Sequence, residues 1–517
     1  MSTYRNHEFS EETGQRIARS IEIMAGQAVL QWDEVAGEYT SESIATMLAK
    51  GNDSLAYGVT IPEGSATACT KVGANAGIAS PTPGYTGVPA VDPYVGRGSF
   101  RTLRVNATVD ADGAPHVTAI EGDGRFALDG SNGNVWVLTP VLYWNFIVGE
   151  LFVSDTKLPG MQPCPCAKLP DGTLRPFMLT ARYWMSNHDG EAASISGAKP
   201  WTYNVSHNSL ISQCKNATTG YSGKSVFDDW YPKVMMLLKY ATKHSQSVFA
   251  GCSTYDLSYP VTVAESGVTR VIVSSANAAN LVVGSTVMVG TANTDRNNAT
   301  AHDVVDSATI TKVEAYDASN SSVFLDLSAT ITTETTHFLK TAPWRSGSTD
   351  GVEGDGTPTA AGRTNGKEPF QLQGIELAGG FNEVLGDVIL DYDGTQGPEI
   401  CICWDSRKEA TSITSDYTRT GKRLHADSSE GWHYPLTPDS AGGLLFGSGN
   451  GASQSTGMCD GHYMNKASVT GTREWLGLGN LGSGGYAGLW YVIGSYGLGF
   501  AWWYIGSRLS GTGRAAA

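Results

Sequence analysis

Hydrophobic residues recur at helical spacing in three stretches of the chain. Residues 10–26 predict one helix, capped by Ser10, whose apolar face is formed by Ile17, Ile21 and Met24. Residues 41–50 predict a second helix, and Gly51 follows its end, where a left-handed residue is favoured. We expect the narrow apolar faces of these two helices to pack either on a partner chain or on the chain's own domain.

The strongest helical pattern lies in residues 228–244. Two aspartates begin it, and a lysine and a histidine end it, which suits the helix dipole. Its apolar residues follow the spacing of one helix face and are Trp230, Val234, Leu237, Leu238 and Ala241. The pattern therefore predicts a helix with a single apolar side.

Elsewhere the pattern is that of β-strands. From residue 101 hydrophobic and polar positions alternate, and the pair Asn132-Gly133 predicts a hairpin. Residues 257–343 are rich in Val, Thr, Ser and Ala, contain no Trp and alternate again, which predicts a separate small all-β module. Residues 344–368 follow as a linker that is flexible by composition.

The last forty or so residues have an unusual composition. Between Glu474 and Arg508 there is no charged residue and no histidine. Gly, Ser and aromatic residues fill this stretch, as they fill antibody binding loops, whereas its glycines and low aliphatic content argue against a membrane helix. If its end is a strand, alternation gives one face the side chains of Phe500, Trp502 and Tyr504. The opposite face then carries Ala501, Trp503 and Ile505.

The same alternation divides the preceding residues into two faces. Trp490 and Val492 share one face, and Tyr491 and Ile493 share the other. One face of such a strand can join the core. The other is either buried by a second layer or forms an exposed apolar patch of the kind that marks a binding site. The residues alone leave these two interpretations open.

Composition and charge narrow the classes of function. A chain of 517 residues predicts two to four domains. The net charge of -15, with no long basic run, argues against binding of nucleic-acid phosphates. The N-terminus shows no signal-peptide pattern, so we expect no export by the usual N-terminal route and no membrane span.

Two C-x-C pairs are the only candidate metal ligands. Side chains two residues apart on a strand face the same side, so four thiolates from two hairpins could hold zinc: Cys164, Cys166, Cys401 and Cys403. Because zinc sites usually have C-x₂-C spacing, half-buried strand cysteines are the favoured interpretation. Carboxylates at 110–113 and 317–320 lack the rest of a calcium loop and predict turns.

No arrangement of residues indicates catalysis. His207, His433 and His462 lie in polar stretches and are interpreted as surface residues. The chain has neither an H-E-x-x-H nor a G-x-S-x-G motif. We therefore predict no enzymatic activity and no cofactor. A bound catalytic metal or a reactive Cys459 would instead favour the hypothesis that the chain is an enzyme.

Three segments near the C-terminus carry a resemblance to a known family. The segments "REW" at 473–475, "AGLWYV" at 487–492 and "WYIGSRLS" at 503–510 resemble motifs of the variable proteins of diversity-generating retroelements. A looser likeness begins near residue 135. The resemblance implies a C-terminal domain with the C-type-lectin fold. The expected fold class is thus mixed α+β, rich in strands and loops, with this fold at the C-terminus, the inserted all-β module and a partly helical N-terminal region.

This resemblance also organises the chain into expected domains. Residues 1–134 would form an N-terminal attachment or oligomerisation region, with its two helices followed by irregular and β structure. Residues 135–256 and 344–517 would together form a split C-type-lectin-like domain. The all-β module, residues 257–343, would be inserted into it.

In such families an error-prone reverse transcriptase rewrites adenines of selected codons, and the affected side chains face solvent from a fixed backbone. The implied variable, ligand-binding positions are Tyr486, Ile493, Ser495, Tyr496, Phe500 and Tyr504, with Tyr491, Asn480 and Leu481 as further candidates. Trp502 joins this surface as a fixed aromatic residue, because its codon also differs from an Asn codon at the third base. The implied scaffold residues are Trp475, Trp490, Trp503, Ile505 and Arg508.

The chain departs from two relatives of this fold. It lacks the Glu-Pro-Asn and Trp-Asn-Asp motifs of calcium-dependent lectins, and the paired catalytic cysteines of formylglycine-generating enzymes. The resemblance therefore implies a phage or prophage receptor-binding protein at the tail tip, a homotrimer attached to other tail proteins through its N-terminal region. Its partner would be a protein or glycan receptor on the host cell. The alternative is a bacterial surface-displayed or effector protein with the same domain.

Overall fold

The computed structural model describes residues 30–111, 113–147, 149–169, 172–218 and 220–511, so the predicted helix at 10–26 lies outside the described residues. Several mostly antiparallel sheets and a few helices make up its regular structure. The fold is mixed α+β and strand-rich, as predicted. Among the described residues, no helix is both long and apolar enough to cross a membrane.

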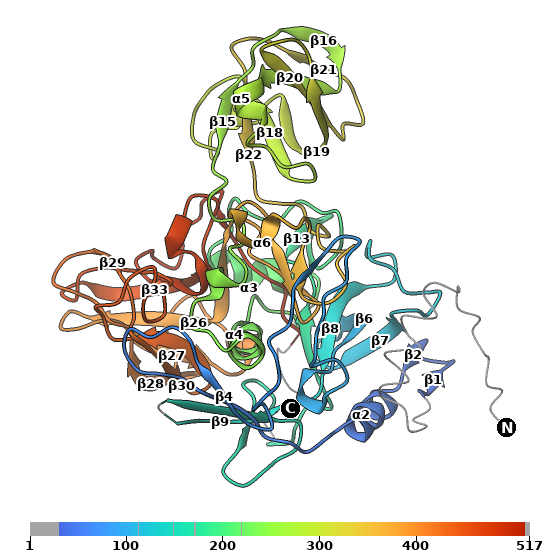
Figure 1. Ribbon diagram of the computed structural model, residues 1–517. Helices are drawn as coiled ribbons and strands as arrows, with labels where there is room; N and C mark the ends of the chain where they lie inside the picture. Colours follow the sequence, from blue (N-terminus) through green and yellow to red (C-terminus); the bar gives the residue numbers. More distant parts are fainter. Residues whose placement is uncertain (1–29, 112, 148, 170–171, 219, 512–517) are drawn as a thin grey trace.

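Helix α4 (Val226–Tyr240) lies at the centre of the molecule (Figure 1). It begins with a capping box: the Asp228 amide donates to the Ser225 hydroxyl, and the Ser225 amide donates to the Asp228 carboxylate. The helix ends at Tyr240 rather than at 244, because Ala241 adopts a left-handed conformation with φ of 50°.

The prediction that this helix has only one buried side is wrong. Its polar residues Asp228, Asp229, Lys233 and Lys239 are each at most 3% exposed. Lys233 pairs with Asp229 one turn earlier, and Lys239 pairs with Asp92 at 2.8 Å. Such partners are needed because an unpaired buried charge is strongly destabilising. Pairing within the protein, and not exposure to water, therefore explains the polar positions of α4.

Residues that precede α4 in the sequence form two sheets. The six-stranded sheet contains, in spatial order, β1 (Trp32–Asp33), β2 (Glu38–Tyr39), β7 (Pro115–Ile120), β6 (Leu103–Val109), β8 (Asn134–Thr139) and β12 (Met178–Ala181). The five-stranded sheet contains β11 (Gln162–Pro163), β9 (Tyr143–Ile147), β10 (Glu150–Ser154), β3 (Tyr57–Thr60) and β4 (Thr70–Gly73). Both sheets are antiparallel throughout.

The second predicted helix is confirmed as α2 (Ser41–Lys50), but its end differs from the prediction. Gly51 has φ of -86°, so it is not left-handed. A Cβ atom there would collide with the guanidinium of Arg101, and this close approach requires the glycine. The predicted hairpin at Asn132-Gly133 is also wrong: β7 and β8 both pair with β6, so this pair ends a longer connection between them.

An eight-stranded sheet packs against α4. Its strands, in spatial order, are β28 (Tyr417–Arg423), β27 (Glu399–Cys403), β26 (Asn382–Asp393), β33 (Thr470–Leu478), β34 (Gly488–Ile493), β32 (His462–Met464) and β29 (Gly431–His433). The eighth strand, β35 (Ile505–Gly506), pairs in parallel with β26. The sheet therefore brings residues 382, 431 and 505 into one layer.

Smaller elements complete the domain around these sheets. The short strands are β5 (Gly84–Tyr85), β23 (Gly356–Thr357), β24 (Phe370–Leu372) and β25 (Ile375–Leu377) in one sheet, and the pairs β13 (Ser186–His188) with β14 (Glu191–Ala193) and β30 (Thr437–Ala441) with β31 (Leu444–Ser448). The helices are α3 (His207–Lys215), α6 (Gly362–Asn365) and the 3₁₀ turns η1 (Gly98–Phe100), η2 (Ser245–Ser247), η4 (Ser406–Lys408) and η5 (Gly484–Tyr486).

Residues 257–343 contain a sheet of their own, at the top of Figure 1. Its strands are β15 (Ser258–Pro260), β22 (Phe338–Thr341), β18 (Thr286–Gly290), β19 (Val305–Ala315), β20 (Asn320–Leu325) and β17 (Arg270–Ser274). The pair β16 (Glu265–Val268) and β21 (Ile331–Thr333), helix α5 (Ser275–Ala278) and turn η3 (Ala299–Ala301) lie beside it. A separate valine-rich cluster forms its core. We call these residues the β module.

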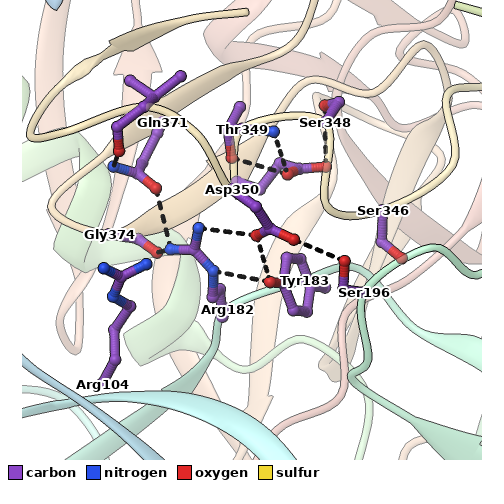
Figure 2. Close-up of polar contacts among 12 residues, drawn as sticks. Arg104, Arg182, Tyr183, Ser196, Ser346, Ser348, Thr349, Asp350, Gln371 and Gly374 are labelled. Atoms are coloured by element: carbon purple, nitrogen blue, oxygen red, sulfur yellow. Dashed lines mark hydrogen bonds and ion pairs between the residues drawn. The ribbon is translucent and has the colours of Figure 1, made fainter. Parts of the chain in front are cut away.

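Residues 344–368, which we call the strap, are not the flexible linker that their composition predicts. Trp344 and Glu368 at its two ends are each 1% exposed, and β23 and α6 lie between them. Figure 2 shows how a buried polar network fixes it: Asp350 accepts hydrogen bonds from Arg182 at 3.0 Å and Ser196 at 2.6 Å. Polar side chains that composition assigns to solvent are here bonded to buried partners.

The network continues from the strap into the small sheet. Arg182 also donates to Gln371 Oε1 at 2.9 Å and to the Gly374 carbonyl at 2.7 Å (Figure 2). Thr349 donates its hydroxyl to the buried carboxylate of Glu376 at 2.7 Å. These donors and acceptors satisfy one another's hydrogen bonds, so the network is best explained as structural: it holds the strap against β24 and β25.

Candidate aromatic binding surface

The side chains that the resemblance assigns to the scaffold are all buried. Trp475, Trp490, Trp503, Ile505 and Arg508 are at most 5% exposed. The Lys233 ammonium of α4 lies over two of these rings, 5.9 Å from the centroid of Trp475 and 5.3 Å from that of Trp490. This cation–π contact in a dry environment ties β33 and β34 to the central helix.

Arg508 connects three parts of the domain. Its guanidinium donates to the carbonyl of Ala181 at 2.8 Å. The next residue is Arg182, which forms the strap network. It forms an ion pair with Glu383 of β26 at 3.1 Å, and Glu383 pairs in turn with Lys224 at 3.1 Å. Burial opposes ionisation, yet Arg508 and Lys224 together lower the pKa of Glu383. The two terminal nitrogens of this buried guanidinium thus join the end of β12 to β26, while its Nε atom has no hydrogen-bond partner among the described residues.

The half-buried aromatic residues of the terminal stretch form a stack of three rings. Tyr496 and Phe500 have centroids 4.1 Å apart with an interplanar angle of 17°. Phe500 and Trp502 follow at 5.8 Å and 5°. The hydroxyl oxygens of Tyr496 and Tyr504 lie 3.3 Å apart, which closes the group. We call Tyr496, Phe500 and Trp502 the loop-borne stack.

These rings lie on a loop, because residues 500–504 do not form the strand that the alternation of side chains assumed. The Ile505 amide donates to the Trp502 carbonyl at 2.9 Å in a turn, and only Ile505–Gly506 pairs with a neighbouring strand. The predicted division of side chains nevertheless holds in part: Trp503 and Ile505 are buried, while Phe500, Trp502 and Tyr504 are half-buried.

A second stack of three rings comes from distant parts of the chain. Tyr486 lies between Trp432, at 4.0 Å and 20°, and Tyr434, at 5.4 Å and 14°. Tyr463 contacts the edge of Trp432 at 5.2 Å and 71°. We call Tyr434, Tyr486 and Trp432 the strand-borne stack, because Trp432 lies on β29, where Tyr463 of β32 is its register partner. Tyr434 directly follows β29, and Tyr486 ends the 3₁₀ turn η5.

Sequence reasoning missed three of these four residues, Trp432, Tyr434 and Tyr463. The aromatic triplet "WHY" at 432–434 and the pair "HY" at 462–463 are a signal, but nothing in the local sequence indicates that the two segments pair. The two stacks are neighbours: the Tyr463 carbonyl accepts from the Gly494 amide at 2.9 Å, and the Asn465 amide group donates to the Ser495 carbonyl at 3.0 Å. Together the stacks form one aromatic surface.

Two residues predicted to face the ligand are instead the floor of this surface. Tyr491 and Ile493 are 2% and 6% exposed, so the prediction that they face solvent is wrong. The Tyr491 ring lies 5.6 Å from that of Trp432, and burial raises the pKa of its hydroxyl. Alternation failed here because both faces of β34 are covered. Leu481 is fully buried as well, while Asn480, Ser495 and Tyr486 are half-buried.

The three histidines interpreted as surface residues are buried. Burial lowers the pKa of His207 and of His433 to about 4, so both are neutral at pH 7. His462 lies with a ring nitrogen 2.9 Å from the Trp490 carbonyl beneath the strand-borne stack. The histidines therefore fill the interior under the surface, where their sequence neighbours gave no indication of burial.

The four-thiolate zinc hypothesis is wrong. Cys401 and Cys403 face one side of β27 together with Tyr417, whereas Cys166 packs against a cluster containing Ile400 and Ile402 of the opposite side. Within the described ranges, no three histidine, cysteine or acidic side chains come together as metal ligands. The favoured interpretation, half-buried strand cysteines, holds only in part: Cys401 and Cys403 lie on β27 but are buried, and Cys164 and Cys166 lie after β11, outside any strand.

Comparison with known proteins adds no relative. A scan of the sequence against protein-family models gives no match, and a search of curated proteins gives none either. The aromatic surface and the residues that hold it are therefore the features that indicate a function.

Proposed function

We propose that this chain is a receptor-binding protein and that the aromatic surface is its ligand site. The observation that carries the proposal is the pair of half-buried ring stacks, Tyr434–Tyr486–Trp432 and Tyr496–Phe500–Trp502, side by side on a fully buried floor. Exposed clusters of aromatic residues are the usual anchors of protein binding sites. Stacking also restricts the rings before binding, which reduces the entropy lost on association.

The sequence resemblance extends this proposal to a biological setting. The split domain would be of the C-type-lectin type, and Tyr486, Ser495, Tyr496, Phe500 and Tyr504 would be positions rewritten by a retroelement. The protein would sit at the tail tip of a phage as a trimer, attached through its N-terminal region, and several copies would add avidity. Partial exposure of these side chains supports the assignment, since such positions can change without disturbing the core.

Binding is tested by replacing Phe500, Trp502 and Tyr504 together with Ala. We expect the purified variant to keep its far-UV circular dichroism spectrum and to lose at least about tenfold of its retention on cells that bind the unaltered protein. The matched control is Trp404→Ala, which removes an aromatic residue that is 38% exposed and outside the surface. Unchanged cell binding by the folded triple variant would overturn the site assignment.

Diversification is tested separately, by deep sequencing of the 3′ end of the gene within one culture. The proposal predicts substitutions confined to adenines of a nearby near-copy and concentrated in the codons of the half-buried positions. A uniform sequence with no such copy would remove the retroelement from the proposal. The alternative, a surface-displayed or effector protein, is separated by asking whether the protein fractionates with phage particles or with cells.

A further inference from the structure

A loop of the β module touches the terminal stretch directly. The Trp503 backbone amide, which has no strand partner, donates to Asn297 Oδ1 at 2.9 Å. The Arg296 guanidinium lies over the Trp503 ring, 4.5 Å from its centroid. Two consecutive residues of the module thus contact both the backbone and the side chain of the residue between Trp502 and Tyr504.

Arg296 is itself held at the base of the module. It forms an ion pair with Asp256 at 2.7 Å, and its Nε and Nη2 atoms donate to the carbonyls of Thr341 at 2.9 Å and Leu257 at 3.3 Å. Leu257 precedes the first strand of the module, and Thr341 ends its last strand. The arginine therefore joins the entry and exit of the module to the loop-borne stack.

A second contact fixes the orientation of the module. Lys199 of the main domain pairs with Asp306 of the module at 2.6 Å, and the Tyr203 ring lies 5.6 Å from that of His302. This ion pair is exposed and contributes little on its own. Together with the Arg296 contacts and the ion pair of Arg345 with Asp326 at 2.8 Å, it gives the module several separate points of attachment, which restrict rotation of the module about its two connecting chains.

We infer that the β module is a positioning element of the binding surface: Arg296 and Asn297 fix Trp503, and through it the rings of Trp502 and Tyr504. The role of the module in ligand binding rests on the proposed function, whereas its role in fixing Trp503 does not. This positioning makes the module part of the site, and it explains why an insertion remote in sequence is fastened at this point. The strand-borne stack has no such contact among the described residues.

The experiment uses the full chain and compares Asn297→Ala with Asn297→Asp. The alanine variant loses the acceptor for the Trp503 amide, and the aspartate variant keeps one. We expect hydrogen exchange in peptides covering residues 500–505 to accelerate about fivefold in Asn297→Ala, the loss of one hydrogen bond, and to stay near the unaltered rate in Asn297→Asp. Peptides covering Trp432 and Tyr463 should not change in either variant.

The matched control is Arg270→Ala, which removes the ion pair between Arg270 and Glu265 at 2.6 Å. Glu265 begins β16, the strand at the outer end of the module in Figure 1. This control should leave exchange at 500–505 unchanged. Equal exchange at 500–505 in Asn297→Ala and the unaltered protein would overturn the inference. Cell retention is measured in parallel and should fall about fivefold with Asn297→Ala. If exchange accelerates but Ala in place of all three rings leaves retention unchanged, the positioning role stands and the proposed function fails.

Discussion

The two stacks have the same three-ring layout and rest on different supports. In the strand-borne stack, Trp432 lies on β29, which pairs residue by residue with β32; Tyr434 directly follows β29, and Tyr486 lies in η5, two residues before β34. In the loop-borne stack, Tyr496, Phe500 and Trp502 lie outside any strand. Their backbone is held at separate points, where the Tyr496 carbonyl accepts from the Glu474 amide at 3.0 Å and the Tyr504 carbonyl accepts from the Asn382 amide at 2.8 Å.

This difference shows two ways of keeping a binding surface rigid. A strand ladder uses backbone groups, so it persists whatever side chain stands at a position. The loop depends on particular side chains, above all those of Arg296 and Asn297 around Trp503. Replacing a ring should therefore disturb the two stacks to different degrees, and the following predictions test this from the largest effect to the smallest.

Arg508→Met should loosen both stacks at once and so remove the difference in rigidity between them. It removes one of the two cations that pair with the buried carboxylate of Glu383 and leaves only Lys224. The loss should therefore lie near the low end of the about 3–5 kcal/mol that removal of one member of a buried ion pair costs. Urea denaturation measures the loss. Arg508→Lys restores the charge without the fork of donors and should recover only part of it. A loss below about 1 kcal/mol would contradict the connecting role of Arg508.

Replacing the central ring of each stack compares them directly. Tyr486→Ala should lower the free energy of unfolding by about 2 kcal/mol, because it removes stacking on both Trp432 and Tyr434. Phe500→Ala should lower it by less than about 1 kcal/mol and instead accelerate hydrogen exchange locally, since the loop can open alone. Tyr486→Phe and Phe500→Tyr serve as controls that keep the rings. Equal global losses for the two alanine variants would show that the supports do not differ.

The loop-borne stack should also respond to pH through Glu474. Burial raises the pKa of this carboxyl well above its ordinary value of 4.5, although the His207 amide donates to it at 3.0 Å. The folded protein thus holds a proton that the unfolded chain releases above that value, so this contribution is complete below pH 4.5 and is lost as pH rises. Glu474→Gln should raise stability at pH 8 by about 1–2 kcal/mol and have little effect at pH 4.

The difference between variant and parent, followed by thermal unfolding across pH 4 to 8, isolates Glu474 from other buried carboxyls. Hydrogen exchange of peptides at 494–500 locates the effect. A pH-independent difference would mean that Glu474 does not titrate in the folded range, and a change confined to peptides around Trp432 would assign it to the other stack.

The smallest effect concerns charge at the edge of the surface. Asp295 of the module is exposed. Burial is the main cause of the raised pKa of Tyr504, the hydrogen bond with Tyr496 is the next, and the negative charge of Asp295 raises it further. Asp295 supplies a negative charge beside an uncharged surface. Asp295→Asn should slow association with receptor-bearing cells by about twofold at low salt and not at high salt. An effect that is independent of salt would assign Asp295 a local structural role instead.

What the sequence by itself determined is local. Caps and periodicity placed α2 within residues 41–50 and located the central helix, because these signals act within a few residues. The resemblance in the terminal motifs singled out five further residues as scaffold, and all five are buried: Trp475, Trp490, Trp503, Ile505 and Arg508. Half of the aromatic surface, the loop-borne stack, was named in advance for the same reason.

Tertiary structure alone decided the rest, because burial depends on what covers a second face. Tyr491, Ile493 and the histidines are polar-looking or alternating positions that become interior once another layer lies over them. Trp432 meets Tyr486, 54 residues later by their numbers, only through the order of strands in the sheet. The strap has the composition of a linker and is fixed by Arg182, which bonds to Asp350 of the strap and to Gln371 and Gly374 at β24 and β25. A pattern along the chain reports only on residues that are close in sequence, whereas the burial of these residues depends on contacts with segments that are distant in sequence.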